Sequence, residues 1–124
     1  MPADFYQKLE EVLKKDPRYK IDAYEFMMQA LGHTQKKLNR QGHVSGRELL
    51  AGVKELGLEL YGPMALNVFH HWGVESTDDC GEIVFNMVNC GLMGSTEKDS
   101  KEDFKNVYDL KEVFDSKEQF KLER

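Results

Sequence analysis

The amino-acid sequence predicts a mainly α-helical fold, a single compact domain of about five helices, and two observations support this prediction. Apolar residues recur at three- and four-residue intervals in five successive segments, which is the spacing of helices that bury one face. Proline, glycine and capping residues separate these segments at positions where helices usually begin and end. The chain has 124 residues, 40% of them hydrophobic and 31% charged, which predicts one soluble globular domain over residues 1–124.

The first predicted helix covers residues 3–15 and the second covers about residues 22–38. Phe5, Leu9 and Val12 share one face of the first helix. Asp16-Pro17 ends it, because the residue before a proline avoids the α region. The apolar stripe of the second helix consists of Ala23, Met27, Ala30, Leu31, Thr34 and Leu38.

A capping box, Ser45-Gly46-Arg47-Glu48, opens the third predicted helix. Its apolar face consists of Leu49, Leu50, Val53, Leu56 and Leu60. Gly52 and Gly57 flank that face, and each costs about 1 kcal/mol relative to alanine inside a helix. We therefore expect a neighbouring helix to approach closely at these glycines.

The fourth predicted helix runs from Pro63 to Trp72, with the proline in its first position. The fifth covers residues 77–90, and its apolar stripe consists of Cys80, Ile83, Val84, Met87, Val88 and Gly91. Phe85 points almost opposite that stripe. A helix with apolar residues on two sides is usually buried between neighbours. The fifth helix is therefore predicted to be the centre of the fold.

The C-terminal part of the chain predicts a short turn capped by Ser100 and a small β-hairpin. The hairpin would pair residues 106–110 with residues 92–96. With the two preceding helices it would form a winged-helix-like variant, the hairpin being the wing. The charged residues 111–124 are predicted to form a loosely ordered tail.

The two cysteines, Cys80 and Cys90, are predicted to be free thiols. Ten residues of helix separate their Cα atoms by about 15 Å, whereas a disulfide needs them within about 7 Å. His70 and His71 precede Cys80 in the sequence, and histidine, like cysteine, can bind zinc. No Cys-x-x-Cys or His-x-x-x-His spacing is present, however. The sequence therefore predicts no metal and no cofactor.

The first residues lack a basic region followed by an apolar one, so no secretory signal is predicted. Apolar runs are all much shorter than the roughly 18 residues of a membrane span. We therefore expect a cytoplasmic protein that does not act in a membrane.

A basic segment stands out against the formal net charge of −5, because no Asp or Glu occurs between Phe26 and Arg47. The candidate binding surface that it offers consists of Lys36, Lys37, Arg40, His43 and Arg47. Phosphate neutralisation supplies much of the affinity for nucleic acids, so residues 36–47 form the candidate nucleic-acid surface. The competing interpretation is a solvated helix end balanced by acids elsewhere. The net charge and the lack of aromatic residues between Gly32 and Leu60 favour it.

Several motifs stand in order along the chain: Asp16-Pro17-Arg18-Tyr19, His43-Val44-Ser45-Gly46-Arg47-Glu48-Leu49, Gly62-Pro63-Met64-Ala65, His71-Trp72-Gly73, Gly81-Glu82-Ile83-Val84-Phe85-Asn86, Asp99-Ser100 and Val107-Tyr108-Asp109. Over roughly residues 5–110 the chain resembles a family of small uncharacterised bacterial proteins of unknown function. The resemblance implies a free-standing cytoplasmic domain. It implies no catalytic residues, cofactor or partner.

The sequence contains no Gly-x-Ser-x-Gly motif, no glycine-rich phosphate loop and no paired carboxylates that can be assigned to a cleft. We therefore predict that the protein is not an enzyme. The favoured function is a non-catalytic protein-interaction or regulatory module that binds an unknown protein partner or a second copy of itself. The alternative is a nucleic-acid-associated protein that uses the basic segment, and the net charge disfavours it.

Overall fold

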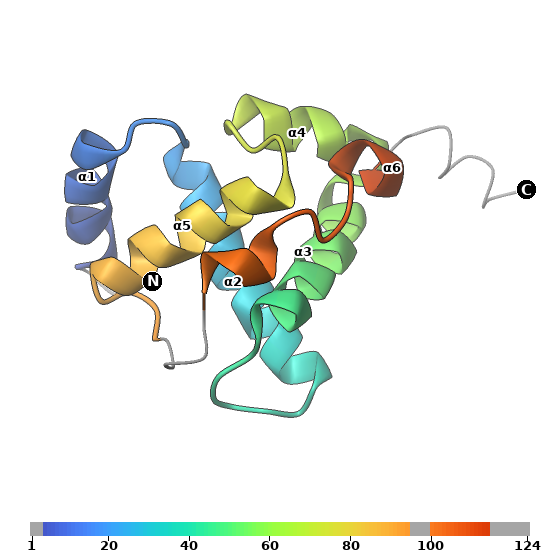
Figure 1. The fold of residues 1–124 in the computed structure, drawn as a ribbon, viewed down its shortest axis with the longest axis horizontal. Coiled ribbons are helices and arrows are strands. Elements are labelled where there is room, and N and C mark those ends of the chain that lie inside the picture. Colours follow the sequence, from blue (N-terminus) through green and yellow to red (C-terminus); the bar gives the residue numbers. More distant parts are fainter. Residues whose placement is uncertain (1–3, 95–99, 115–124) are drawn as a thin grey trace, which may run out of the picture.

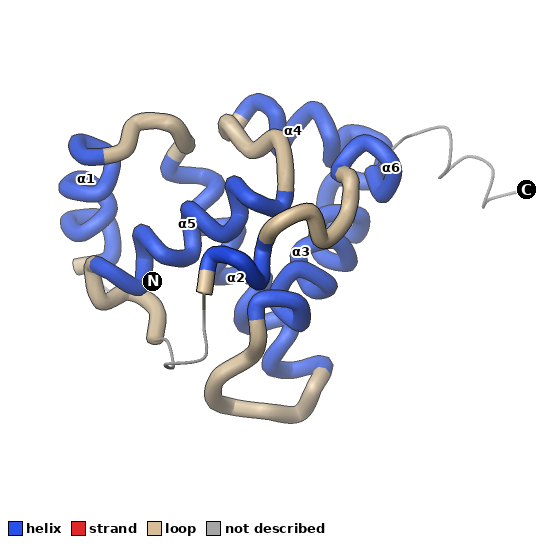
Figure 2. The backbone as a smooth tube through the Cα atoms, viewed as in Figure 1, coloured by secondary structure: helices blue, strands red, loops and turns tan. Residues whose placement is uncertain are grey.

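A computed structural model of the chain describes residues 4–94 and 100–114. Within these residues the fold consists of helices and loops without a strand, as Figures 1 and 2 show. The α-helices are α1 (Phe5–Lys15), α2 (Ile21–Lys37), α3 (Gly46–Tyr61), α4 (Ala65–His71), α5 (Thr77–Asn89) and α6 (Leu110–Phe114), with the 3₁₀ turns η1 (Gly62–Met64) and η2 (Lys101–Phe104). The prediction of a mainly helical, compact single domain is confirmed.

Helix α5 is the centre of the fold, as the sequence predicted. It packs against α1, α2, α3 and η2, and it crosses the middle of the molecule in Figure 1. Cys80, Ile83 and Met87 on its apolar stripe are fully buried. Phe85, on its other side, makes an edge-to-face contact with Phe104 of η2, with ring centroids 6.3 Å apart. Helix α5 therefore has apolar neighbours on both sides. Cys80 and Cys90 are both free thiols.

The two glycines of α3 mark close contacts with different neighbours. A Cβ atom on Gly52 would collide with the side chain of Thr34 on α2. A Cβ atom on Gly57 would lie 3.1 Å from Phe69 of α4 and 3.2 Å from Phe114 of α6. Gly52 therefore allows α2 to approach α3 closely, and Gly57 does the same for α4 and α6.

The start of the fourth helix differs from the prediction. Pro63 lies in the 3₁₀ turn η1, and the α-helix begins two residues later at Ala65. At the other end of α4, Phe69 stacks on Trp72 with ring centroids 5.6 Å apart, and Phe26 of α2 packs on both rings. This aromatic cluster fixes α4 on the core.

The predicted hairpin is absent from the described parts of both of its strands, residues 92–94 and 106–110, while residues 95 and 96 lie outside the described residues. Asn106 has a φ of 49°, which turns the chain. Its backbone N–H donates to Asp78 at 3.1 Å, and the N–H of Val107 donates to the Thr77 hydroxyl at 3.1 Å. The segment is thus held as a loop on the first turn of α5.

The contact of residues 106 and 107 with α5 also tests the prediction of a winged-helix-like variant. The acidic first turn of α5 holds the backbone of residues 106 and 107, and most of α5 is covered by its neighbours. The described residues therefore offer neither a wing nor an exposed reading helix of the winged-helix type.

The segment predicted as a loosely ordered tail begins differently in the structure. Residues 111–114 lie within α6, and Phe114 is fully buried, with its ring centroid 4.9 Å from that of Phe69. Residues 115–124 of the predicted tail lie outside the described residues. Among the described helices, none combines the length and the apolar character needed to cross a membrane.

Candidate functional site

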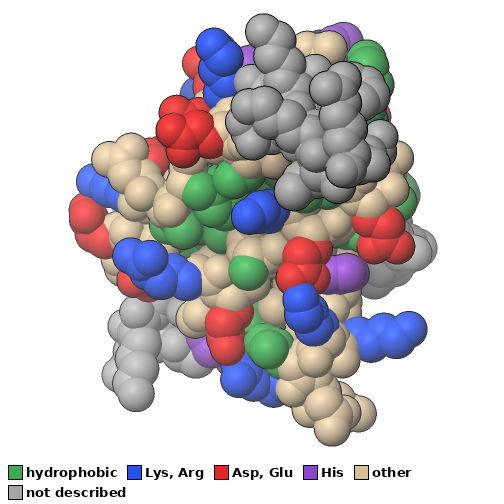
Figure 3. All heavy atoms as spheres, turned by 90° about the vertical axis from the view of Figure 1, so that its right-hand side faces the viewer, with side chains coloured by type: hydrophobic (Ala, Val, Ile, Leu, Met, Phe, Trp, Pro, Cys, Tyr) green, Lys and Arg blue, Asp and Glu red, His purple; other side chains and the backbone are tan. Residues whose placement is uncertain are grey.

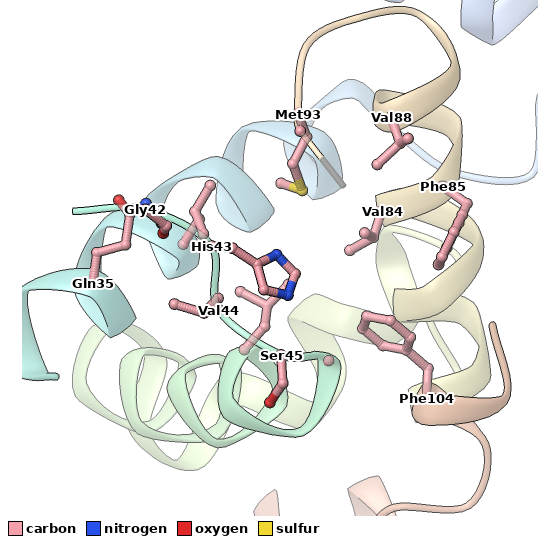
Figure 4. Close-up of a pocket in the computed structure, with 14 residues that line it drawn as sticks. Gln35, Gly42, His43, Val44, Ser45, Val84, Phe85, Val88, Met93 and Phe104 are labelled. Atoms are coloured by element: carbon pink, nitrogen blue, oxygen red, sulfur yellow. The ribbon is translucent and has the colours of Figure 1, made fainter. Parts of the chain in front are cut away.

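A cavity of about 250 Å³ lies where the α2–α3 loop, residues 38–45, faces α5 and η2 (Figure 4). We call it the loop cavity. Its lining consists of Leu31, Gln35, Gly42, His43, Val44, Ser45, Gly46, Leu49, Val84, Phe85, Val88, Met93, Gly94 and Phe104. Gly42, His43, Ser45 and Gly94 are exposed residues, so the cavity opens to the surface.

The wall opposite the loop is apolar because α5 and η2 meet there. Val84, Phe85 and Val88 stand on α5, and Phe104 stands on η2. The Phe104 ring can pack at this position because two glycines beside it have no side chain. A Cβ on Gly81 would lie 2.8 Å from the Phe104 side chain, and a Cβ on Gly46 would lie 2.9 Å from it.

The loop wall is held in place by hydrogen bonds to α2 and α3. The Gln35 side chain donates to the Gly42 carbonyl at 2.9 Å, and the Arg40 backbone N–H donates to the Gln35 carbonyl at 2.9 Å. The capping box is present in both halves: Ser45 N–H donates to Glu48 at 2.8 Å, and Glu48 N–H donates to Ser45 Oγ at 3.1 Å. One side of the cavity is therefore fixed by contacts made before any ligand binds.

The polar groups of the cavity do not form a catalytic pair. Figure 4 shows the His43 imidazole projecting from the loop toward Val84, while the Ser45 hydroxyl points away from that ring. Ser45 Oγ accepts the Glu48 amide and so serves as the cap of α3. A serine nucleophile would need a base within hydrogen-bond reach of its hydroxyl. The loop cavity is therefore better suited to binding an apolar group than to catalysing acyl transfer.

Two of the predicted cationic site residues are paired with acids of α3. Lys37 forms an ion pair with Glu55, and Arg40 donates to Glu48 at 2.7 Å through Nη1. Hydrogen bonds from Lys37 and then His33 lower the pKa of Glu55. The Ser45 N–H, followed by Arg40, lowers the pKa of Glu48.

The other predicted residues are not gathered into one patch. Lys36 is exposed, and its helical register places it opposite the buried face of α2 that carries Ala30 and Thr34. Arg47 is exposed in the first turn of α3, and His43 lines the cavity. On the face shown in Figure 3, basic and acidic side chains are interspersed.

A polar cluster that the sequence did not predict links the α1–α2 turn to α5. Arg18 forms an ion pair with Asp16 at 2.7 Å and approaches Glu82 at 3.4 Å. Asn86 donates to Asp16 at 2.9 Å and to the Tyr24 hydroxyl at 3.0 Å. The hydrogen bonds from Arg18, and then Asn86, hold the pKa of Asp16 well below its usual range. This cluster ties the turn to the central helix.

Two groups near α5 that could act as nucleophiles, Tyr19 and Cys80, have raised pKa values. Burial, followed by the hydrogen bond that its hydroxyl donates to Asp79 at 2.5 Å, raises the pKa of Tyr19. Burial raises the pKa of the Cys80 thiol to about 12. A nucleophilic cysteine needs a lowered pKa, so Cys80 has the properties of a core residue. No group of three or more His, Cys, Asp or Glu side chains in residues 4–94 and 100–114 is arranged to hold a metal ion.

No family model matches this chain, and the comparisons with curated proteins and with solved structures gave no match. The resemblance to small bacterial proteins of unknown function therefore stays a prediction. The loop cavity itself was not predicted, because Val84 and Val88 were assigned to the core stripe. The position of Phe85 off that stripe indicated that α5 is covered on a second side, but it did not indicate a cavity.

Proposed function

We propose that this protein is a non-catalytic protein-interaction module, and that its loop cavity receives one large apolar side chain of a partner. The observation that carries the proposal is the cavity itself, a surface-open hollow of about 250 Å³ with apolar walls on α5 and η2. Side chains that fill pockets and exclude water from them dominate the binding energy at many protein interfaces.

The size of the cavity favours a single side chain over a larger ligand. An apolar cavity of about 150 Å³ is enough to bind benzene, so the ring of a phenylalanine fits within the loop cavity. Sites for drug-sized ligands or cofactors usually enclose about 300–1,000 Å³. The fixed loop wall supports the same function, because a wall formed before binding reduces the entropy lost on association.

The nucleic-acid alternative has weaker support. Lys37 and Arg40 already pair with Glu55 and Glu48, so two of the five candidate residues carry compensated charge. The non-enzyme part of the proposal is supported by the orientation of Ser45 away from His43 in Figure 4.

Toluene, which matches a phenylalanine side chain, tests the proposed cavity by NMR titration. In the wild-type protein it should shift the methyl signals of Leu31, Val84, Val88 and Met93, all of which line the cavity. Val88→Trp fills the space and should abolish the shifts. Met93→Trp fills the cavity from the segment that follows α5, and it replaces Val88→Trp as the test variant if Val88→Trp does not fold.

Met64→Trp is the matched control, because Met64 is 56% exposed on η1 and does not line the cavity. This variant should retain the wild-type response to toluene. Toluene shifts that persist in the folded filling variants, or that are absent from the wild-type protein, would contradict the proposal.

A further inference from the structure

We infer that the segment recognised by the loop cavity is acidic and places one large apolar side chain in the cavity. This inference rests on the proposed function, and the distribution of charge in this chain indicates the sign of the partner's charge. Residues 26–55 contain five Lys or Arg residues and two Glu residues, whereas the whole chain carries a net charge of −5. Residues 26–55, which include the loop wall and the adjoining parts of α2 and α3, therefore have an excess of three positive charges.

Arg47, Lys36 and Lys105 each adjoin a residue that lines the cavity, but Lys36 lies opposite the buried face of α2 and Lys105 is paired with Glu102. Arg47 follows the lining residue Gly46, is exposed, and forms no ion pair with any residue in the described part of the chain. Arg40 is 46% exposed and binds Glu48 and the His43 carbonyl through Nη1. Arg47 is therefore the principal candidate for pairing with a carboxylate of the partner.

The geometry of α3 adds to the attraction. Ser45 and Gly46, at the N-terminus of this 16-residue helix, line the cavity. The first turn of α3 therefore borders the cavity. The helix dipole favours negative charge at that end, and Arg47 adds a full positive charge. Complementary charge of this kind speeds encounter and discriminates between partners.

The same charges do not favour a nucleic acid equally. Sequence-tolerant binding of single strands relies on aromatic side chains that stack on bases, and the loop of residues 38–45 contains no Phe, Tyr or Trp. Phe85 and Phe104 lie edge-to-face on each other, at an interplanar angle of 89°. An apolar side chain uses the walls of the cavity, whereas a phosphate backbone does not.

Four labelled peptides of equal length test the inference by fluorescence anisotropy at physiological ionic strength. They carry a central phenylalanine with glutamate and aspartate flanks, the same phenylalanine with glutamine flanks or with lysine flanks, and a central alanine with acidic flanks. The acidic phenylalanine peptide should bind at least tenfold more tightly than each of the other three. Equal binding of the glutamine-flanked peptide would overturn the inference.

Two charge reversals separate local recognition from net charge. Arg47→Glu should weaken binding of the acidic phenylalanine peptide at least tenfold, and an acid in the first turn of a helix is compatible with folding. Lys14→Glu makes the same change of charge on an exposed residue of α1, which does not line the cavity, and should leave the affinity within about twofold of wild type. Equal losses in the two variants would overturn a specific role for Arg47.

Two further results distinguish this inference from the proposed function. If the glutamine-flanked phenylalanine peptide binds as well as the acidic one, and Val88→Trp abolishes that binding, the interaction module stands and the acidic partner is wrong. If no phenylalanine peptide binds, both fail. Displacement of the acidic peptide by an oligonucleotide at a lower concentration than by unlabelled peptide would favour the nucleic-acid alternative and overturn the inference.

Discussion

Gly52 of α3 lies so close to Thr34 of α2 that no side chain fits between them. A Cβ on Gly52 would collide with Thr34 Oγ1 and would lie 3.4 Å from the Ala30 carbonyl oxygen. Thr34 is only 4% exposed, and its hydroxyl donates to that same carbonyl at 2.8 Å. This contact sets the spacing of the two helices that carry the loop wall of the cavity.

Replacing Gly52 with alanine should therefore destabilise the protein by about 1–3 kcal/mol. Alanine favours the helix by about 1 kcal/mol, but the added methyl group overpacks the interface or forces Thr34 to rotate. Rotation would leave a buried hydroxyl without its acceptor, which costs about 1–3 kcal/mol. Urea unfolding of Gly52→Ala and wild type measures the difference.

Gly32→Ala is the matched control for this prediction. Gly32 lies within α2, and no atom lies within 4 Å of a Cβ built on it. The same substitution should therefore stabilise the protein by about 0.5–1 kcal/mol. Equal shifts of the two variants in the same direction would show that contact with Thr34 does not decide the outcome.

The cap of α3 gives a second prediction. Ser45→Ala removes the hydroxyl that accepts the Glu48 amide, and it should cost about 1 kcal/mol of stability, as is usual for loss of an N-cap. Ser76, the N-cap residue of α5, makes no side-chain cap hydrogen bond. Ser76→Ala should therefore leave the midpoint of thermal unfolding nearly unchanged. A similar loss in both variants would contradict the role assigned to the Ser45 hydroxyl.

The Asp16 cluster predicts a dependence of stability on pH. The pKa of Asp16 is lowered in the folded protein, chiefly by its hydrogen bonds with Arg18. A carboxyl group with a lowered folded pKa stabilises the protein above its unfolded pKa, about 3.9. That contribution is lost as the pH falls from about 4 toward the folded pKa.

Urea unfolding of wild type and Asp16→Asn at several pH values isolates this contribution. Other carboxylates with lowered pKa values, such as Glu48, Glu55 and Glu82, remain in both proteins. The wild-type advantage should be largest at neutral pH and should shrink below about pH 4. An advantage that is constant down to pH 3 would mean that packing, not charge, accounts for the role of Asp16.

Local signals in the sequence were sufficient for most of the fold. The capping box at Ser45 identified the start of α3, because both of its hydrogen bonds join residues three apart. The position of Phe85 opposite the apolar stripe identified α5 as central, and the structure covers that side with Phe104. The periodicity of buried residues thus predicted which faces are covered.

The predicted hairpin does not form in its described residues, 92–94 and 106–110, because tertiary contacts override local strand propensity. Val107 and Tyr108 are residues that favour strands. In the structure the Tyr108 hydroxyl donates to the Leu50 carbonyl at 2.6 Å, and the Val107 N–H donates to Thr77. Both partners are at least 30 residues away in sequence. No local pattern specifies such contacts.

The loop cavity and the pairing of the basic segment were beyond prediction for the same reason. The acids that pair with Arg40 and Lys37 lie 8 and 18 residues later. Whether they reach those cations depends on how α2 and α3 pack. A cavity depends on several elements at once, and residues of α2, the α2–α3 loop, α3, α5 and η2 all line this one.

The basic segment supplies the last prediction, which tests the nucleic-acid alternative. If Lys36, Lys37 and Arg40 bind phosphates, replacing all three with glutamine should reduce the slope of log affinity against log salt by roughly two to three units. We expect instead that neither protein binds mixed-sequence DNA or RNA measurably at moderate salt. Lys37 and Arg40 are paired with Glu55 and Glu48, and the chain carries a net charge of −5.

Loss of these exposed pairs should cost about 0–1 kcal/mol each, so the triple variant should remain folded and its binding can be compared with that of wild type. Micromolar binding by wild type that the triple variant abolishes would establish the alternative.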